Sequence, residues 1–335
     1  MKIAFFEIED WEKEYLKNQL KEAEIIYFPE KLSESNVEQA KDCDAIAVFI
    51  DSKLDKEMLS KFSRLKLIAT RSTGFDHIDL DFAKEKNITI CNVPFYGENT
   101  VAEHAFALML DLSRKMYDSI ERVKKEGFSI EGLTGFDLKG KTLGIVGMGH
   151  IGQHVARIAN GFEMKVLGYD VMQDKKLAKK LGFAYADLEE LLKNSDIITL
   201  HVPYNEKTHH LLNSANMGLI KKGAYLINTA RGGIIETGAL AKALGDGTLA
   251  GAGLDVLEEE CFIKEERQLM SKEFAKTCDI KTLLQNHILM EQNNVIITPH
   301  NAFNSKEALE RILETTVENI RAFIKRKPTN LVNKK

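Results

Sequence analysis

Three ionisable residues stand directly after apolar runs in the second half of the chain, and their chemistry is complementary. Arg231 follows AYLINTA, Glu260 follows GLDVLEE and His300 follows NVIITP. In an open α/β sheet, ligands bind in the crevice outside the carboxyl ends of the strands, so the three side chains are expected to share one site. A guanidinium can hold an anion, and an imidazole beside a carboxylate can move a proton.

A glycine-rich loop in mid-chain indicates the cofactor that such a site would use. Gly147, Gly149 and Gly152 follow the β-rich run TLGIV and open the helical run HVARIAN. The first glycine permits a tight turn, the second lets the backbone approach a pyrophosphate, and the third allows close packing of the helix. The helix N-terminus then offers N–H groups to the phosphates.

The next predicted strand, KVLGYD, ends on Asp170, 18 positions after Gly152. A carboxylate at about this interval accepts hydrogen bonds from the ribose diol and repels a 2′-phosphate, which favours NAD over NADP. Lys175 and Lys176 follow closely, and residual NADP use stays open.

Length and composition restrict the class of protein. The chain has 335 residues, which predicts about two domains, with 44% hydrophobic and 29% charged residues and a net charge of −4. We expect no nucleic-acid partner, because no basic surface is indicated, and no membrane partner, because no apolar run approaches the roughly 18 residues of a span. No signal peptide is predicted and the four cysteines are scattered, which is typical of reduced thiols in a cytoplasmic protein.

The order of elements predicts an α/β fold with two doubly wound parallel-sheet domains. Residues 1–97 alternate short β-rich runs with helical segments, and a second βα series starts at Thr142. Between them, residues 98–125 contain no Gly or Pro and predict one long helix that bridges the domains. The amphipathic final helix, about 305–326, is expected to return to the first domain. The expected domains are 1–98 plus 301–335 and 99–300.

Two pairs of histidines are not expected to bind metal. His150 and His154 lie four residues apart on one predicted helix, but no third ligand is evident. The adjacent His209 and His210 would point to opposite sides of any regular backbone and are predicted to lie on the surface.

Several motifs occur together in one order: GMGHIG, NTARGG, GLDVLEEE and TPHNAF, with RSTGFDHIDL and VPFYGENTVAEH in the first half. In this combination the chain resembles the D-isomer-specific 2-hydroxyacid dehydrogenase family, and within it the D-lactate dehydrogenases most closely. The resemblance implies a flavodoxin-like substrate domain and a Rossmann NAD-binding domain around a cleft, and a homodimer. It also implies NAD-dependent interconversion of a small 2-oxo acid and its D-2-hydroxy acid, with pyruvate and D-lactate as the expected pair.

By this resemblance, Arg231 binds the substrate carboxylate and His300 is the acid/base. The family spacing places the partner of His300 five positions after Asp255, at Glu260, whereas Glu258 and Glu259 are interpreted as solvated loop residues. The resemblance also implies a substrate-binding set and a cofactor-binding set. The substrate set is Thr73, Gly74, Tyr96, Arg231 and Phe49, the last of which could equally be ordinary core. The cofactor set is Gly147, Gly149, His150, Ile151, Gly152, Asp170, Val202, Pro203, Thr208, Thr229, Ala230 and Asp255.

The chain departs from the family pattern near the substrate. Cys261 replaces a frequent proline, and Asn301 and Asn304 stand where lactate-type enzymes have other residues. The sequence therefore leaves open another D-2-hydroxy acid, such as 2-hydroxyisocaproate, glycerate or 3-phosphoglycerate, and the physiological direction. An alternative of a different class is a non-catalytic dimeric scaffold that senses NAD.

Overall fold

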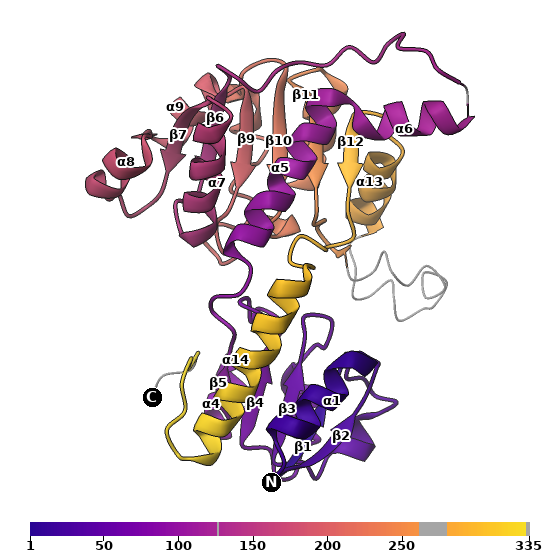
Figure 1. The fold of residues 1–335 in the computed structure, drawn as a ribbon, viewed down its shortest axis with the longest axis vertical. Coiled ribbons are helices and arrows are strands. Elements are labelled where there is room, and N and C mark those ends of the chain that lie inside the picture. The colour runs from indigo at the N-terminus through magenta and orange to yellow at the C-terminus, as the bar shows by residue number, and fades with distance from the viewer. Residues whose placement is uncertain (126, 261–279, 333–335) are drawn as a thin grey trace. The chain divides into compact units, whose positions relative to one another are not determined.

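A computed structural model describes residues 1–125, 127–260 and 280–332. Its contacts divide the chain into two compact units, drawn in Figure 1. Unit 1 comprises Met1–Tyr96 and Ser305–Lys335, and unit 2 comprises Gly97–Asn304. Unit 1 is therefore discontinuous in sequence, and the divisions lie at 96/97 and 304/305.

Unit 1 is built on a five-stranded parallel sheet. The strand order is β2-β1-β3-β4-β5, which is the flavodoxin-like order. The strands are β1 (Lys2–Phe5), β2 (Glu24–Tyr27), β3 (Ala45–Val48), β4 (Leu67–Thr70) and β5 (Thr89–Cys91).

Alternate residues of these strands enter two different cores, so both faces of the sheet are buried. Ile3 and Phe5 pack with α1 and α14, whereas Ala4 and Phe6 pack in the cluster that includes side chains of α2, α3 and α4. The helices are α1 (Asp10–Gln19), α2 (Val37–Ala40), α3 (Lys56–Ser60), α4 (Leu80–Glu85) and α14 (Lys306–Ile324). The final helix thus packs on the first domain, as the sequence predicted, with Ser305 as its N-cap.

Unit 2 contains a seven-stranded parallel sheet in the order β12-β11-β10-β9-β6-β7-β8. The first strand of the unit, β6, is central, and the order reverses beside it, as in a Rossmann fold. The strands are β6 (Thr142–Val146), β7 (Lys165–Tyr169), β8 (Ala184–Tyr185), β9 (Ile197–Leu200), β10 (Ala224–Asn228), β11 (Leu249–Leu254) and β12 (Val295–Ile297).

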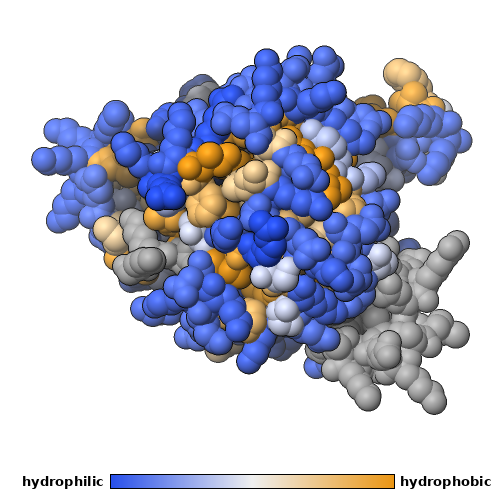
Figure 2. All heavy atoms as spheres, turned by 90° about the horizontal axis from the view of Figure 1, so that it is seen from below, coloured by the Kyte–Doolittle hydropathy of each residue, from blue (hydrophilic) through white to orange (hydrophobic). Residues whose placement is uncertain are grey.

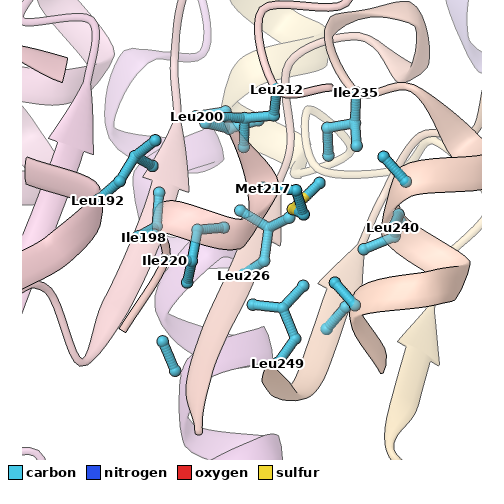
Figure 3. Packing of buried hydrophobic residues seen from close by; sticks show 14 of the residues in the cluster. Leu192, Ile198, Leu200, Leu212, Met217, Ile220, Leu226, Ile235, Leu240 and Leu249 are labelled. Carbon is cyan, nitrogen blue, oxygen red and sulfur yellow. The ribbon is translucent and has the colours of Figure 1, made fainter. Parts of the chain in front are cut away.

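Helices also cover both faces of this sheet (Figure 1). One core joins Leu143 and Ile145 to α5 and α7. The other joins Ile198 and Leu226 to α9 and α10, and Figure 3 shows part of this second core. The helices are α5 (Glu98–Arg114), α6 (Met116–Lys125), α7 (His150–Gly161), α8 (Lys175–Leu181), α9 (Leu188–Asn194), α10 (Thr237–Gly245) and α13 (Ile280–Met290), with 3₁₀ turns η1 (Met217–Leu219) and η2 (Gly232–Ile234). The predicted pair of doubly wound parallel sheets is confirmed.

One prediction about a helix is wrong. Residues 98–125 do not form a single bridging helix, because α5 ends at Arg114, Lys115 adopts a left-handed conformation with φ of 49°, and α6 follows, all within unit 2. The Asp111 side chain accepts a hydrogen bond from Tyr117 N at 2.7 Å, and the Lys115 N–H donates to Asp111 O. A left-handed lysine carries no sequence signal of the kind that Gly or Pro gives.

The surface seen from below is mostly hydrophilic, with hydrophobic side chains gathered in smaller patches (Figure 2). Within the described ranges, none of the helices is both long and apolar enough to span a bilayer. Cys43 and Cys91 are free and buried, whereas Cys261 and Cys278 lie outside the described residues.

Candidate active site

The three ionisable residues lie at the carboxyl ends of three neighbouring strands of unit 2. Arg231 follows β10, Glu260 follows β11 and His300 follows β12, and these strands are adjacent in the sheet. The polypeptide between β11 and β12 is long, so Glu260 and His300 are 40 positions apart in sequence. Parallel pairing of their strands is what brings them to one edge.

Glu260 and His300 form a close imidazole–carboxylate pair. His300 Nδ1 lies 2.6 Å from Glu260 Oε1, and the two side chains are 15% and 32% exposed, respectively. Glu260 Oε2 accepts a hydrogen bond from Leu257 N at 3.1 Å, which fixes the carboxylate on its own loop. Because a carboxylate only accepts, the proton of this bond resides on Nδ1 and the second ring nitrogen, Nε2, is left for proton exchange.

The backbone of His300 is held in a left-handed conformation, with φ of 53°. Non-glycine residues rarely adopt this region unless the surrounding structure requires it. Here His300 N donates to Asp255 O at 2.8 Å, and the Asp255 carboxylate accepts from Asn301 N at 2.9 Å and Ala302 N at 2.8 Å. The end of β11 thus determines the direction in which the imidazole leaves β12.

Asp255 is itself buried, with 1% of its surface exposed. Thr298 Oγ1 donates to its Oδ1 at 2.5 Å, and His104 Nε2, from α5, lies 3.4 Å from the same oxygen. Burial alone would raise the pKa of Asp255, but the hydrogen bonds from His104, Thr298 and the two backbone N–H groups outweigh it and hold the pKa below its ordinary value. In this structure the carboxylate organises the His300 turn, and contact with a cofactor stays a prediction.

Arg231 has an extended backbone and is the N-cap of η2. Hydrogen bonds from neighbouring residues hold its loop. Asn228 Nδ2 donates to Arg231 O at 2.9 Å, and Asn228 Oδ1 accepts from Ala230 N at 3.0 Å. A Cβ on Gly232 would lie 2.0 Å from the carbonyl carbon of Leu257 and 2.2 Å from Glu258 N. Only glycine fits there, so the arginine loop lies directly against the loop that carries the carboxylate.

The glycine loop fits a dinucleotide by its backbone geometry. Gly147 has φ of +100°, and a Cβ on Gly152 would lie 2.0 Å from Gly147 O, so both positions require glycine. A Cβ on Gly149 would meet no atom within 4 Å, which leaves open space above the loop. No side chain caps the N-terminus of α7 at Gly149, so its first N–H groups suit an anion, and His150 and Ile151 form that first turn.

The other predicted cofactor residues follow the carboxyl ends of neighbouring strands. Val202 and Pro203 follow β9, and Thr208 Oγ1 donates to Pro203 O at 2.6 Å, which closes that loop. Thr229 and Ala230 follow β10. The Thr229 hydroxyl is buried and has no partner in the described part of the chain, which marks a polar group suited to a ligand.

Asp170, at the end of β7, is not simply solvated. Its Oδ2 accepts from Met148 N at 2.8 Å and its Oδ1 from Met172 N at 2.9 Å, so it ties the glycine loop to β7. Each carboxylate oxygen has a second lone pair, and the residue can still accept from a ribose hydroxyl.

The other predicted substrate-binding residues lie in unit 1, in the loops that follow β3, β4 and β5. They are Phe49, Thr73, Gly74 and Tyr96. Thr73 Oγ1 donates to Val93 O at 2.8 Å, Ser72 Oγ donates to Gly74 O at 2.6 Å, and Tyr96 O accepts from Arg311 Nε at 2.6 Å. These bonds fix the loops, and the roles of Thr73, Gly74 and Tyr96 in substrate binding stay predictions.

Phe49 is half-buried, and its backbone is held by the partly buried carboxylate of Glu7. Glu7 accepts from Phe49 N at 2.8 Å and from Ser52 Oγ at 2.5 Å, and burial raises the pKa of Glu7 although these bonds oppose the change. Arg71 lies 5.7 Å from the Phe49 ring centroid and forms a buried ion pair with Glu12. The structure therefore fixes the position of Phe49 closely, and its pocket role stays a prediction.

Two interpretations of polar residues are wrong. His209 and His210 do not point to opposite sides, because His210 has φ of 48° and the rings stack with centroids 3.8 Å apart. Glu258 is not a solvated loop residue, since its Oε1 lies 2.6 Å from His210 Nε2. The sequence carried no signal for this pair, whose members are 48 positions apart.

Metal-binding geometry is not present in the ranges described. Among residues 1–125, 127–260 and 280–332, no three His, Cys, Asp or Glu side chains are grouped to hold an ion. His154 Nδ1 instead lies 3.2 Å from Arg157 Nη1.

Comparison with known proteins identifies close relatives. Residues 106–302 match the family model described as "D-isomer specific 2-hydroxyacid dehydrogenase, NAD binding domain". D-Lactate dehydrogenase of Escherichia coli is 35% identical over 328 residues, which cover 96% of each chain. Glyoxylate reductase of Thermococcus litoralis is 38% identical over 306 residues, 89% of this chain and 86% of the reductase. The crystal structure of D-lactate dehydrogenase from Aquifex aeolicus, complexed with NAD and lactic acid, superimposes with a TM-score of 0.87 at 40% identity, covering 99% of both chains.

The glycine loop yields a matched pair of variants. Gly152→Ala should lower the free energy of unfolding by about 1–3 kcal/mol, because the added methyl meets a backbone carbonyl that cannot move freely. Gly149→Ala should change stability by less than about 0.5 kcal/mol, because the methyl enters open space, yet weaken NADH binding about tenfold by blocking close approach. Urea unfolding and NADH fluorescence titration measure both quantities. An unchanged NADH affinity in Gly149→Ala would contradict the predicted approach of the pyrophosphate.

His201, directly after β9, makes unit 2 sensitive to acid. Its Nδ1 is buried without a partner among the described residues, and burial lowers its pKa to about 3. The folded chain thus keeps His201 neutral, whereas the unfolded chain protonates it below its ordinary pKa near 6.5. The contribution of neutral His201 to the free energy of unfolding is therefore complete above about pH 6.5 and is lost as the pH falls toward about 3.

Between pH 7 and pH 5 the free energy of unfolding should fall by about 2 kcal/mol because of His201, since each pH unit below about 6.5 lowers it by about 1.4 kcal/mol. His201→Gln should therefore show a smaller fall in unfolding free energy over this range than the unsubstituted protein, as measured by urea unfolding at each pH. The exposed His209→Gln is the control and should leave the fall unchanged. Equal falls in all three proteins would refute the assignment.

Proposed function

We propose that this chain, which belongs to the D-isomer specific 2-hydroxyacid dehydrogenase family, reduces a small 2-oxo acid to its D-2-hydroxy acid with NADH and catalyses the reverse reaction with NAD. The observation that carries the proposal is the 2.6 Å contact between His300 Nδ1 and Glu260 Oε1. These residues follow β12 and β11, and β11 is the neighbour of β10, which Arg231 follows. For the substrate pair we propose pyruvate and D-lactate.

His300 would exchange the proton through Nε2. With Nδ1 occupied by the Glu260 carboxylate, the protonated ring can donate only from Nε2, to the oxygen of the 2-oxo group. The carboxylate favours the imidazolium and fixes the orientation of the ring. In the oxidative direction, neutral Nε2 accepts the hydroxyl proton.

Arg231 would hold the substrate carboxylate, because its planar fork of donors matches the two oxygens of that group. When bound, the nicotinamide cofactor supplies or accepts the hydride. The residues suited to hold it are the 147–152 loop, Asp170 and Thr229, whose buried hydroxyl has no partner among the described residues.

The choice of pyruvate draws its support from full-length relatives. D-Lactate dehydrogenases are among them, both in sequence and in structure. Glyoxylate reductases are similarly related, so glyoxylate is the nearest competitor. Both candidates are small 2-oxo acids, and Asn301 and Asn304, beside His300, are the residues in this chain that could favour either one.

A panel of substrates tests the proposal. Protein and NADH are mixed with pyruvate, glyoxylate, phenylpyruvate or 2-oxoisocaproate, and the absorbance of NADH is followed. Pyruvate should give the highest kcat/KM, and the product should be the D-isomer by chiral chromatography. A preference for glyoxylate would overturn the D-lactate assignment alone. NADH binding without turnover of any substrate would overturn the enzyme assignment and favour a scaffold that senses NAD.

Substitutions of His300 and Arg231 distinguish proton transfer from substrate binding. His300→Ala should lower kcat by about 10²–10⁴ while NADH affinity is retained, because only proton transfer is lost. Arg231→Lys should raise KM for the 2-oxo acid as well as lower kcat, since the bidentate geometry is lost. A His300→Ala enzyme with full activity would show that another group transfers the proton.

We also propose that the protein forms a homodimer through α6 and the residues that follow it. None of the α6 side chains is buried, and Met116, Tyr117, Ile120 and Val123 expose apolar surface. Phe128 and Ile130 continue this surface at 97% and 87% exposure. An isolated monomer would leave an extended apolar patch in water, and a second copy of the chain would cover it.

Sedimentation velocity tests the dimer. The unsubstituted protein should sediment as a dimer at micromolar concentration, and Val123→Glu should shift it toward monomer because a carboxylate would be buried at the interface. The adjacent Lys124→Glu, on the charged side of α6, is the control and should remain dimeric. A dimer that persists in Val123→Glu would place the interface elsewhere.

A further inference from the structure

We propose that His210 and Glu258 form a second imidazole–carboxylate pair whose task is to position Arg231 relative to Glu260 and His300. The pair lies within unit 2, and neither residue belongs to the catalytic set described above. The inference rests on the proposed function, because it assigns to this pair an effect on that reaction.

His210 contacts the arginine loop through its backbone and the carboxylate loop through its ring. Its backbone N–H donates to Gly233 O at 2.8 Å, two residues after Arg231. Its Nε2 lies 2.6 Å from Glu258 Oε1, and because a carboxylate only accepts, Nε2 carries the proton. Asn213 Nδ2 donates to His210 O at 2.8 Å and supports the left-handed backbone at this residue.

Glu258 is held by more than the histidine. Thr237 Oγ1, at the start of α10, donates to Glu258 Oε2 at 2.7 Å, and Asn286 Nδ2, from α13, donates to Glu258 O at 2.6 Å. The side chain is only 18% exposed, against 32% for His210. Both carboxylate oxygens and the carbonyl oxygen therefore have protein partners, which is more than a solvated loop residue requires.

The peptide between Leu257 and Glu258 connects the two halves of the catalytic set. On one side it lies against Gly232, where no side chain fits. Its carbonyl oxygen, Leu257 O, accepts from Glu260 N at 3.3 Å, and the N–H of the preceding peptide, Leu257 N, donates to Glu260 Oε2 at 3.1 Å. A shift of this peptide would therefore change the distance between Arg231 and the Glu260–His300 pair.

His210 and Glu258 restrain this peptide through side-chain contacts, so they are positioning residues and not catalytic residues. Glu236 also faces the histidine, and its pKa is lowered first by hydrogen bonds from Ser214 and to a lesser degree by His210. His210 thus lies near a second carboxylate besides that of Glu258.

The experiment compares His210→Ala, His210→Gln and the control His209→Ala in two measurements. The first is kcat and KM for pyruvate. The second is the NMR chemical shift of His300 Nδ1, in protein labelled in histidine and assigned with His300→Gln. His210→Ala should lower kcat/KM about ten- to a hundredfold, because small displacements of reacting groups are costly. It should also change the Nδ1 chemical shift of His300, because the hydrogen bond to the displaced Glu260 carboxylate is weakened.

His210→Gln keeps an N–H donor at the end of the side chain and should restore both quantities most of the way. The exposed His209→Ala should match the unsubstituted protein. If His210→Ala fails to fold, Thr237→Val removes the hydroxyl from Glu258 Oε2 and should shift both quantities in the same direction by less.

Each outcome decides the inference. If His210→Ala matches His209→Ala in both measurements, the pair does not position the site. Loss of activity in His210→Ala with an unchanged His300 Nδ1 chemical shift and no recovery in His210→Gln also overturns the proposal. If the unsubstituted protein turns over no 2-oxo acid, the proposed function fails, while the His300 Nδ1 chemical shift still decides whether the pair positions the Glu260–His300 contact.

Discussion

The hydrogen bonds that the Asp255 carboxylate accepts fix the turn from Thr298 to Ala302, and the position of His300 depends on that turn. A left-handed backbone at histidine is unfavourable by itself, so it must be compensated by bonds that no other conformation could make. Asp255 supplies them from the adjacent strand, with Thr298 Oγ1, Asn301 N and Ala302 N as donors. Since β11 and β12 are paired in parallel, the sheet itself brings acceptor and donors into register. The imidazole of His300 is thus placed by backbone pairing, and the Glu260 carboxylate contacts its Nδ1.

The second constraint on the site is that backbone segments approach each other closely, and glycine makes this possible in two places. At the cofactor loop, Gly152 allows α7 to begin against Gly147. At the proposed catalytic edge, Gly232 allows the Arg231 loop to touch the peptide of Leu257 and Glu258. In both places the functional groups project from loops whose separation is set by direct backbone contact. Such contacts have little freedom to adjust, because the interior is densely packed.

The sequence predicted what depends on local pattern. Short apolar runs and the GMGHIG loop identified the strands and the fold class, and the positions of Arg231, Glu260 and His300 after their runs placed these residues at strand ends. It could not predict features that depend on a single left-handed residue or on contacts between distant segments. The break at Lys115 and the stacking of His209 on His210 are of the first kind. The pairing of Glu258 with His210 is of the second kind, because its partners are 48 positions apart in sequence.

Residues of unit 2 make the contacts that hold Arg231, Glu260 and His300 in place, as described above. Asn228, Leu257 and Asp255 provide these contacts, and each belongs to the same sheet or its loops. These contacts set the geometry of the Glu260–His300 pair within the unit that matches the NAD-binding family model. In unit 1, the partly buried carboxylate of Glu7 fixes the backbone of Phe49 and the hydroxyl of Ser52. Under the proposed roles, a substitution at Phe49 would therefore change the substrate pocket from one unit, while the Glu260–His300 contact is built within the other.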